Sequence, residues 1–228
     1  MTDIATGPWA GQEIRALWRL THVLDRVQVA DTPGGPLTVF QVMGRAGIDV
    51  LLLLGEEGRT AADVLTAGID VLARRFHRTP VHAVPGTRPG PGITVGYTYT
   101  YTREEPQLRV MVPPFTVRSD HDLLAHPQVF GLDAVTDAFR GHFPAISDQP
   151  LAISAAAQSC TASFQADGFE AAAVTAFGAV AAGVAPRPPH RTKRISVAFD
   201  RPFGFLTIDR RTRLILTTGW IAEPPAWP

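Results

Sequence analysis

Short apolar stretches separated by turns run through the first quarter of the chain, and this pattern predicts a β-sheet. Strands are expected at 27–29 and 37–42, around a Pro-Gly-rich turn at 31–35. The most apolar run, Ile-Asp-Val-Leu-Leu-Leu-Leu at 48–54, is typical of a strand buried inside a sheet. Residues 12–24 have apolar side chains at spacings that suit either a short helix or an ordered approach to a strand.

One helix is expected, at 60–72. Thr60 is a good N-cap, and Asp63 follows three residues later, which is the spacing of a capping box. The apolar positions of this segment fall on one face of a helix. After a loop expected at 81–96, Tyr and Thr alternate at 97–102, which predicts a strand whose tyrosine face packs against other residues.

The second half of the chain again predicts strands. They are expected at 108–117, at 159–164, and in a hairpin of 197–208 and 214–221 around the polar turn 209–213. In the 159–164 segment, Cys160, Ala162 and Phe164 share one face, so Cys160 is expected to be a small buried apolar residue.

A long segment with no clear periodicity separates two of these strands. Gly168 can turn or hinge the chain, alanine-rich residues follow at 170–176, and a proline-broken basic run ends at Arg194. Loops of this length are uncommon in compact domains and are usually functional or disordered. Three interpretations stay open for the small residues: a linker, a short helix, or a mobile arm that can enter a sheet as an extra strand.

Composition limits the possible partners. The 228 residues carry no formal net charge, 45% are hydrophobic and 18% are charged, as in a globular chain with a sizeable core. We therefore expect neither nucleic-acid nor membrane binding. The basic run 187–194 is a local exception, but no aromatic residues interleave its charges. The start of the sequence has no signal-peptide pattern, so a cytoplasmic location is expected as written, and an extracellular one if a longer precursor exists.

No catalytic or metal-binding pattern stands out. His121, His126 and His142, with Asp120 and Asp122, lack the spacing of a closed zinc site. Ser154 and Ser159 lie in no G-x-S-x-G turn of a serine hydrolase. The glycines at 86, 90 and 92 alternate with prolines, which lack the N–H groups that a phosphate-binding loop needs. We expect no cofactor, no metal and no enzymatic activity.

Several motifs together resemble the serpin family of serine protease inhibitors. These are V-P-P-F-T-V-R-S at 112–119, an alanine hinge after Gly168, F-D-R-P-F at 199–203, and a final strand with G-W-I-A-E-P at 219–224. Their order and spacing carry the resemblance, which extends at least over 108–224 and more weakly over 37–72. The resemblance implies an α+β fold with mixed sheets, a few helices and a long exposed reactive loop at about 168–195. It also implies one serpin-like domain over 1–228 whose amino-terminal part is missing.

The same resemblance implies a function. A serine protease would cleave the loop, and the freed hinge would insert into a sheet as a new strand. The hinge residues would be Gly168, Phe169, Glu170, Ala171, Ala172, Ala173, Val174 and Thr175. Counting from the hinge gives a scissile bond at Ala182–Gly183 and an elastase-like target, whereas counting back from Phe199 gives Arg191–Thr192 and a trypsin-like target. The alternative is a non-inhibitory serpin-fold module, because bulky Phe169 and the missing amino-terminal half would impair insertion.

Overall fold

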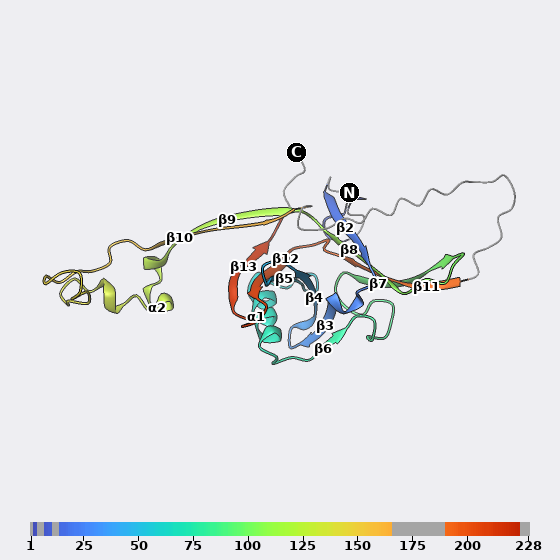
Figure 1. The fold of residues 1–228 in the computed structure, drawn as a ribbon, viewed down its shortest axis with the longest axis horizontal. Helices are drawn as coiled ribbons and strands as arrows, with labels where there is room; N and C mark the ends of the chain where they lie inside the picture. Colours follow the sequence, from blue (N-terminus) through green and yellow to red (C-terminus); the bar gives the residue numbers. More distant parts are fainter. Residues whose placement is uncertain (1, 4–6, 11–13, 166–189, 224–228) are drawn as a thin grey trace. The chain divides into compact units, whose positions relative to one another are not determined.

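The computed structural model describes residues 2–3, 7–10, 14–165 and 190–223 (Figure 1). The chain divides into two compact units. Unit 1 comprises Met1–Phe115 and Phe164–Pro228, and unit 2 comprises Thr116–Ser163. Each unit is described separately below.

The largest sheet of unit 1 is antiparallel throughout and has six strands among the described residues. Their order across the sheet is β13-β12-β5-β4-β3-β6. The strands are β3 (Val27–Thr32), β4 (Gly35–Met43), β5 (Ile48–Leu54), β6 (Arg78–Pro80), β12 (Phe203–Asp209) and β13 (Ile215–Ile221). The strands expected at 27–29, 37–42, 48–54 and 214–221 are thereby confirmed, as is the turn at 209–213.

Helix α1 (Ala61–Leu72) covers one face of this sheet. Its start is as expected: the Thr60 hydroxyl accepts a hydrogen bond from the Asp63 backbone N–H at 3.2 Å. The buried helix positions Val64, Ala67, Gly68 and Val71 pack against the sheet residues Ala30, Leu37, Val39, Leu51, Leu53, Leu206 and Ile208. A β-carbon on Gly68 would lie 2.2 Å from a methyl carbon of Leu53, so the helix and sheet approach closely because this residue has no side chain.

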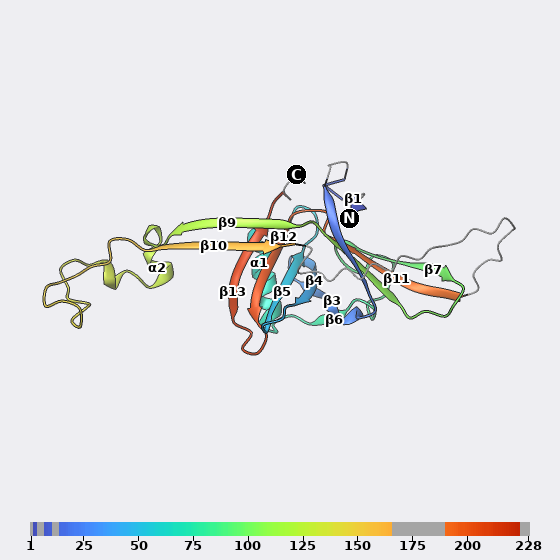
Figure 2. The same ribbon diagram turned by 45° about the horizontal axis from the view of Figure 1, so that its top comes forward.

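Unit 1 contains a second, mixed sheet. Its strands are β1 (Thr2–Asp3), β2 (Arg15–Thr21), β7 (Ile93–Thr100), β8 (Gln107–Val112) and β11 (His190–Ala198), in the order β1-β2-β8-β11-β7. Figure 2 labels β7 and β11, which lie side by side. Strands β8 and β11 are parallel, and the other pairs are antiparallel.

Aromatic rings cluster where the chain passes from β11 of the second sheet to β12 of the first. Phe40 of the first sheet and Phe199, just after β11, have ring centroids 6.5 Å apart, and Phe199 lies 5.1 Å from Phe203. The Thr38 hydroxyl also donates a hydrogen bond to the Pro91 carbonyl at 2.8 Å, which ties the segment before β7 to the first sheet. The core therefore joins strands from both ends of the chain.

Unit 2 contains a two-stranded sheet of β9 (Phe115–Asp122) and β10 (Ala157–Phe164), whose first and last residues respectively belong to unit 1. Between the strands lie the short helices η2 (Leu123–Ala125), α2 (Pro127–Phe130) and η3 (Ala134–Thr136); a further short helix, η1 (Leu24–Arg26), precedes β3 in unit 1. Large apolar side chains of this unit are exposed, with Phe139 at 94% and Val129 at 77%.

Residues 15–21, where either a short helix or an approach to a strand was expected, form strand β2 because they pair with β8. Two other expectations about secondary structure need correction. The expected strand 108–117 is broken into β8 and β9 at Pro113 and Pro114, which cannot donate backbone hydrogen bonds in a sheet. The expected strand 197–208 is likewise two strands, with Phe199–Pro202 between β11 and β12.

Candidate functional site

Strands β10 and β11 flank residues 166–189, where most of the candidate site residues fall. The hinge residues 168–175 lie outside the described residues, and so do Ala182 and Gly183. Strand β10 ends at Phe164, and β11 begins at His190. The structure therefore describes the two attachment points of this segment, which are the end of β10 and the start of β11.

The amino-terminal attachment point is an aromatic stack. Phe164 is 7% exposed, and its ring lies parallel to that of Phe115, with centroids 5.4 Å apart and an interplanar angle of 9°. Phe115 in turn contacts Phe205 of the first sheet, at 5.5 Å between centroids. Along β10, Cys160 and Ala162 are partly buried and their neighbours are exposed, so the expected alternation is present although Cys160 is not fully buried.

The carboxy-terminal attachment point is an interior strand. Residues His190 to Val197 of β11 pair with β7, and Arg194 to Ala198 also pair with β8. Residues 190–195, the last part of the segment expected as a reactive loop, are therefore held in a sheet. Arg191 and Thr192, one of the two candidate scissile pairs, lie in this strand. The Arg191 guanidinium carbon is 3.5 Å from the centroid of the Tyr97 ring, and Thr192 is 3% exposed.

The F-D-R-P-F segment forms the bend that carries the chain from β11 to β12. Asp200 is buried, and its carboxylate accepts a hydrogen bond from Arg201 Nε at 2.9 Å. The Asp200 carbonyl accepts a second one from the backbone N–H of Trp9 at 3.1 Å. The motif thus anchors the segment after the candidate loop in the core.

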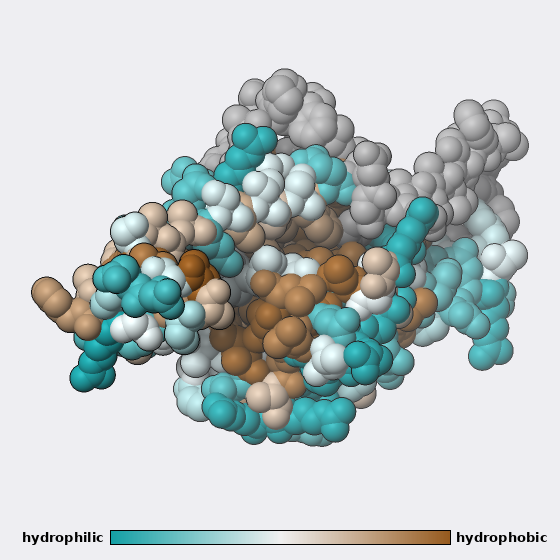
Figure 3. Space-filling model, turned by 60° about the vertical axis from the view of Figure 1, so that its left-hand side comes forward, coloured by the Kyte–Doolittle hydropathy of each residue, from teal (hydrophilic) through white to brown (hydrophobic). Residues whose placement is uncertain are grey.

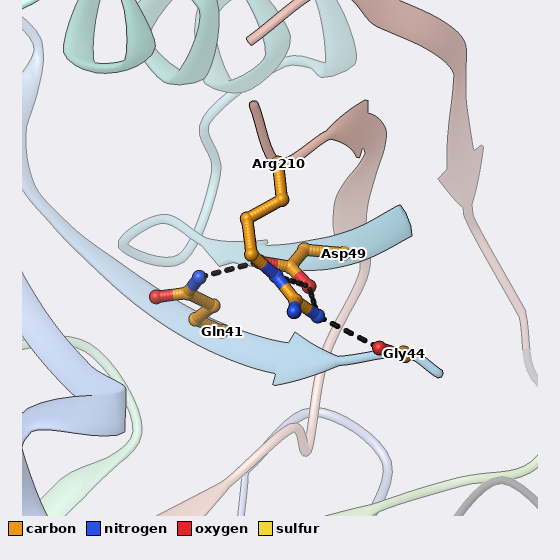
Figure 4. A network of polar contacts seen from close by, with 4 residues as sticks. All are labelled: Gln41, Gly44, Asp49 and Arg210. Atoms are coloured by element: carbon orange, nitrogen blue, oxygen red, sulfur yellow. Dashed lines mark hydrogen bonds and ion pairs between the residues drawn. The ribbon is translucent and has the colours of Figure 1, made fainter. Parts of the chain in front are cut away.

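A buried ion pair fixes the far end of the hairpin formed by β12 and β13 (Figure 4). The Asp49 carboxylate, on β5, is completely buried and accepts hydrogen bonds from Arg210 Nη2 at 2.6 Å and from Gln41 Nε2 at 2.7 Å. Arg210 also donates to the Gly44 carbonyl at 2.7 Å. Burial alone would raise the pKa of Asp49, but the hydrogen bonds and charge of Arg210 hold this pKa below its ordinary value.

The histidines and serines of unit 2 do not assemble a site. Among the described residues, no group of three or more His, Cys, Asp or Glu side chains is placed to hold a metal ion. The Ser159 hydroxyl donates a hydrogen bond to Asp120 at 2.5 Å, and no histidine is hydrogen-bonded to it. His121 is hydrogen-bonded to Ser119. This arrangement contains no nucleophile–histidine–carboxylate chain in the described part.

Unit 1 has a shallow apolar pocket of about 530 Å³ at the end of α1. It is lined by Ile69, Leu72, Ala73, Arg74, Arg213, Leu214 and Ile215, and Leu214 is 63% exposed. Apolar side chains also gather in the middle of the face shown in Figure 3. Contiguous apolar surface is typical of sites that contact a ligand or partner.

None of the helices in the described ranges has the length and apolarity required to cross a membrane.

The pairing of β7 with β11 was not anticipated from the sequence, and it corrects the expectation for the tyrosines. Tyr97 and Tyr99 are 53% and 62% exposed, so this face is not a packed one. They lie on β7, at the edge of the mixed sheet, opposite Lys193 and Arg191. The alternation of Tyr and Thr predicted a strand but not which of its faces would be covered.

Comparisons with known proteins agree with this arrangement. The family pattern described as "Serpin (serine protease inhibitor)" matches residues 97–224, which is more than half of the chain. A search of the curated proteins found no similar sequence.

Solved serpin structures resemble the fold at low sequence identity. A serpin from the trematode Schistosoma haematobium has a TM-score of 0.55 and 13% identity, covering 93% of this chain and 47% of its own. Mouse protein-Z dependent protease inhibitor has a TM-score of 0.56 and 11% identity, covering 93% and 46%. Native protease nexin-1 crystallised with heparin has a TM-score of 0.56 and 17% identity, covering 92% and 48%. The chain thus spans about half the length of these structures, and it belongs to the serpin family.

Proposed function

We propose that this chain inhibits a serine protease through a cleavable bait loop between β10 and β11. The family match carries this proposal, because it includes both flanking strands and every residue of the loop between them. The protease serine would attack the carbonyl carbon of the scissile residue. An ester to the protease would form, and the amine of the next residue would leave with a proton.

The position of β11 favours Ala182–Gly183 as the scissile bond. A protease binds its substrate as an extended, unpaired strand, and β11 is already paired with β7. Cleavage at Arg191–Thr192 would require residues 190–193 to leave that sheet first. Ala182 presents a small side chain, so an elastase-like protease is the proposed target and a trypsin-like protease is the second choice.

After cleavage, the small residues 168–175 would add as a strand beside β10. Strand addition and release of stored strain are known ways in which a loop can enter a sheet. Roughly ten inserted residues, at about 1 kcal/mol for each backbone hydrogen bond, would make the change irreversible. Phe169 is the bulkiest residue of the hinge and is expected to slow its insertion.

A second candidate function is a serpin-fold module that binds a partner without trapping a protease. Two observations favour it. The chain spans about half the length of the solved serpins, and the sheet that holds β10 has two strands in the described part. A strand inserted into so small a sheet has few neighbours to stabilise it.

Incubation of the purified full chain with elastase and with trypsin separates the two functions. An inhibitor forms a complex that survives SDS gel electrophoresis, whereas a binding module is either left intact or simply cleaved. If Ala182 is the scissile residue, A182R transfers complex formation from elastase to trypsin, and R191Q leaves the elastase complex unchanged. A172R puts a charge into the inserting strand, so it is expected to convert inhibition into plain cleavage. Cleavage of the unaltered chain by both proteases without any complex would overturn the inhibitor proposal.

A further inference from the structure

In the middle of the mixed sheet of unit 1, one face is apolar and buried, and the other carries two arginines. Strand register places Leu108 and Val110 of β8 on the same face as Ile195 and Val197 of β11, and all four are buried. The opposite face, called here the outer face, carries the alternate residues. They include Trp18 and Leu20 of β2, Gln107, Arg109 and Met111 of β8, Thr192, Arg194, Ser196 and Ala198 of β11, and Gly96 of β7; of these, Gln107, Thr192 and Ala198 are buried.

Arg109 and Arg194, on the outer face, form no ion pair with a residue that the structure describes. Within the described residues, the guanidinium of Arg109 makes no hydrogen bond or ion pair and lies over the Trp18 ring, 5.4 Å from its centroid. Arg194 donates one hydrogen bond, from Nη2 to Gln107 Oε1 at 3.0 Å. Both side chains are half-buried, and the Nε atom of each is buried without a partner. Buried guanidinium N–H groups normally donate hydrogen bonds, so each of these two Nε atoms still needs an acceptor.

The carboxylate of Glu104 does not serve as this acceptor. Glu104 Oε2 accepts a hydrogen bond from Gln107 Nε2 at 2.6 Å. That bond turns the amide oxygen of Gln107 towards Arg194 and orients the guanidinium. Glu104 therefore acts on Arg194 through Gln107 and forms no ion pair with it in the described part of the chain.

Space and a hydroxyl group lie beside the two arginines. Ser196 pairs directly with Arg109 and is two residues from Arg194 on the same strand. Given the usual spacing of strands and residues, these three positions form a triangle with sides of about 5 to 8 Å. Gly96, which pairs with Arg194, has no atom within 4 Å of where a β-carbon would lie, so the space next to the arginine is open.

We propose that Arg109, Arg194 and Ser196 bind a tetrahedral oxyanion, a phosphate or sulfate group, on the outer face of β8 and β11. Arginine is suited to this role because its planar set of N–H donors matches the oxygens of such groups. The serine hydroxyl supplies a donor between the two guanidiniums. The Trp18 ring limits the site on the β2 side, and the gap at Gly96 gives access on the β7 side. The site does not depend on the bait-loop proposal.

Isothermal titration of the full chain with inorganic phosphate and, separately, with sulfate tests this site, at an ionic strength held constant with sodium chloride. Saturable binding of either anion is expected, and the tighter of the two identifies the group that the site prefers. R109Q and R194Q should each weaken binding about tenfold, as expected for loss of one charge-assisted contact. S196A should weaken it about threefold, because its contact is uncharged. The matched control R19Q removes an exposed arginine from the opposite face of neighbouring β2, and should leave binding unchanged.

A steric variant separates loss of the site from loss of the fold. G96V adds an exposed β-branched side chain to a strand, into open space, and leaves both arginines in place. It should keep the circular dichroism spectrum and thermal midpoint of the unaltered chain while weakening oxyanion binding. A titration in which the heat of binding does not saturate would show that there is no such site. Equally strong binding by the R109Q/R194Q double variant would show the same.

Discussion

Replacing Asp49 by asparagine tests whether the buried ion pair of Figure 4 stabilises the first sheet. The carboxylate of Asp49 is fully buried and receives three short donor contacts, from Arg210 Nε at 3.0 Å, Arg210 Nη2 at 2.6 Å and Gln41 Nε2 at 2.7 Å. Removing one partner of a buried pair typically costs 3–5 kcal/mol. We expect about 3 kcal/mol, the lower end of this range, because the Arg210 side chain is 39% exposed and its charge can be hydrated.

Urea unfolding at neutral pH, followed by circular dichroism, measures this cost. The expected loss corresponds to a fall in thermal midpoint of about 6–12 °C for a chain of this size. D148N is the matched control, because it makes the same chemical change at an exposed aspartate of unit 2. A D49N variant within about 0.5 kcal/mol of the unaltered chain, the usual range for surface substitutions, would refute the reasoning that this pair holds the turn after β12 to β5.

The pH dependence of the same comparison follows from the lowered pKa of Asp49. Its ordinary pKa is 3.8, and the folded pKa lies below that. The stabilisation is therefore fully present above the unfolded value and is lost as the pH falls through the folded one. The stability difference between the unaltered chain and D49N should be constant near neutrality and shrink below about pH 4. Asp209, whose pKa is lowered by hydrogen bonds from Thr212, is present in both proteins and contributes equally to their acid sensitivity.

Three other substitutions test the packing that surrounds the candidate site. T60A removes the cap of α1 and should cost about 1 kcal/mol in urea unfolding, whereas no loss would mean that the cap is unimportant. G68A should destabilise by about 1–3 kcal/mol although alanine favours helices, because its β-carbon would meet Leu53; a more stable G68A would contradict the close approach. F164A removes the ring stacked on Phe115 and should cost about 3 kcal/mol in thermal or urea unfolding, and a neutral result would mean that this stack does not anchor β10.

Local sequence patterns predicted the elements that form from neighbouring residues. The strand at 48–54 and the helix capped by Thr60 have the expected bounds within one residue, because their apolar spacing and cap are complete within each segment. The motif F-D-R-P-F contributed to the family resemblance, but one continuous strand was expected across it, and the bend at Phe199–Pro202 was not. The bend contains Pro202 and the buried Asp200. The backbone N–H of Trp9 donates a hydrogen bond to the Asp200 carbonyl, and this contact comes from a distant part of the chain.

Pairings between distant segments could not be predicted in the same way. The apolar spacing of β2 left a short helix and an approach to a strand both open, because its partner β8 lies more than eighty residues later in the chain. No local pattern indicated that the tyrosines of β7 pair with the basic residues of β11. For the same reason, the oxyanion proposal depends on register, which brings Arg109 and Ser196 together from segments that carry no shared motif.

The two ends of the proposed bait loop differ in a way that bears on its function. Strand β11 is paired on both sides over Arg194 to Val197, so the loop's carboxy-terminal end stays fixed if the loop is cut. Strand β10 has one partner, β9, in the described part, so only this side offers an open strand edge to a freed arm. Cleavage at Ala182–Gly183 would place the whole small-residue hinge on the β10 side of the cut. This chain can therefore trap a protease by insertion only if the freed hinge pairs with β10. A cleaved chain that gains no thermal stability would favour the binding module instead.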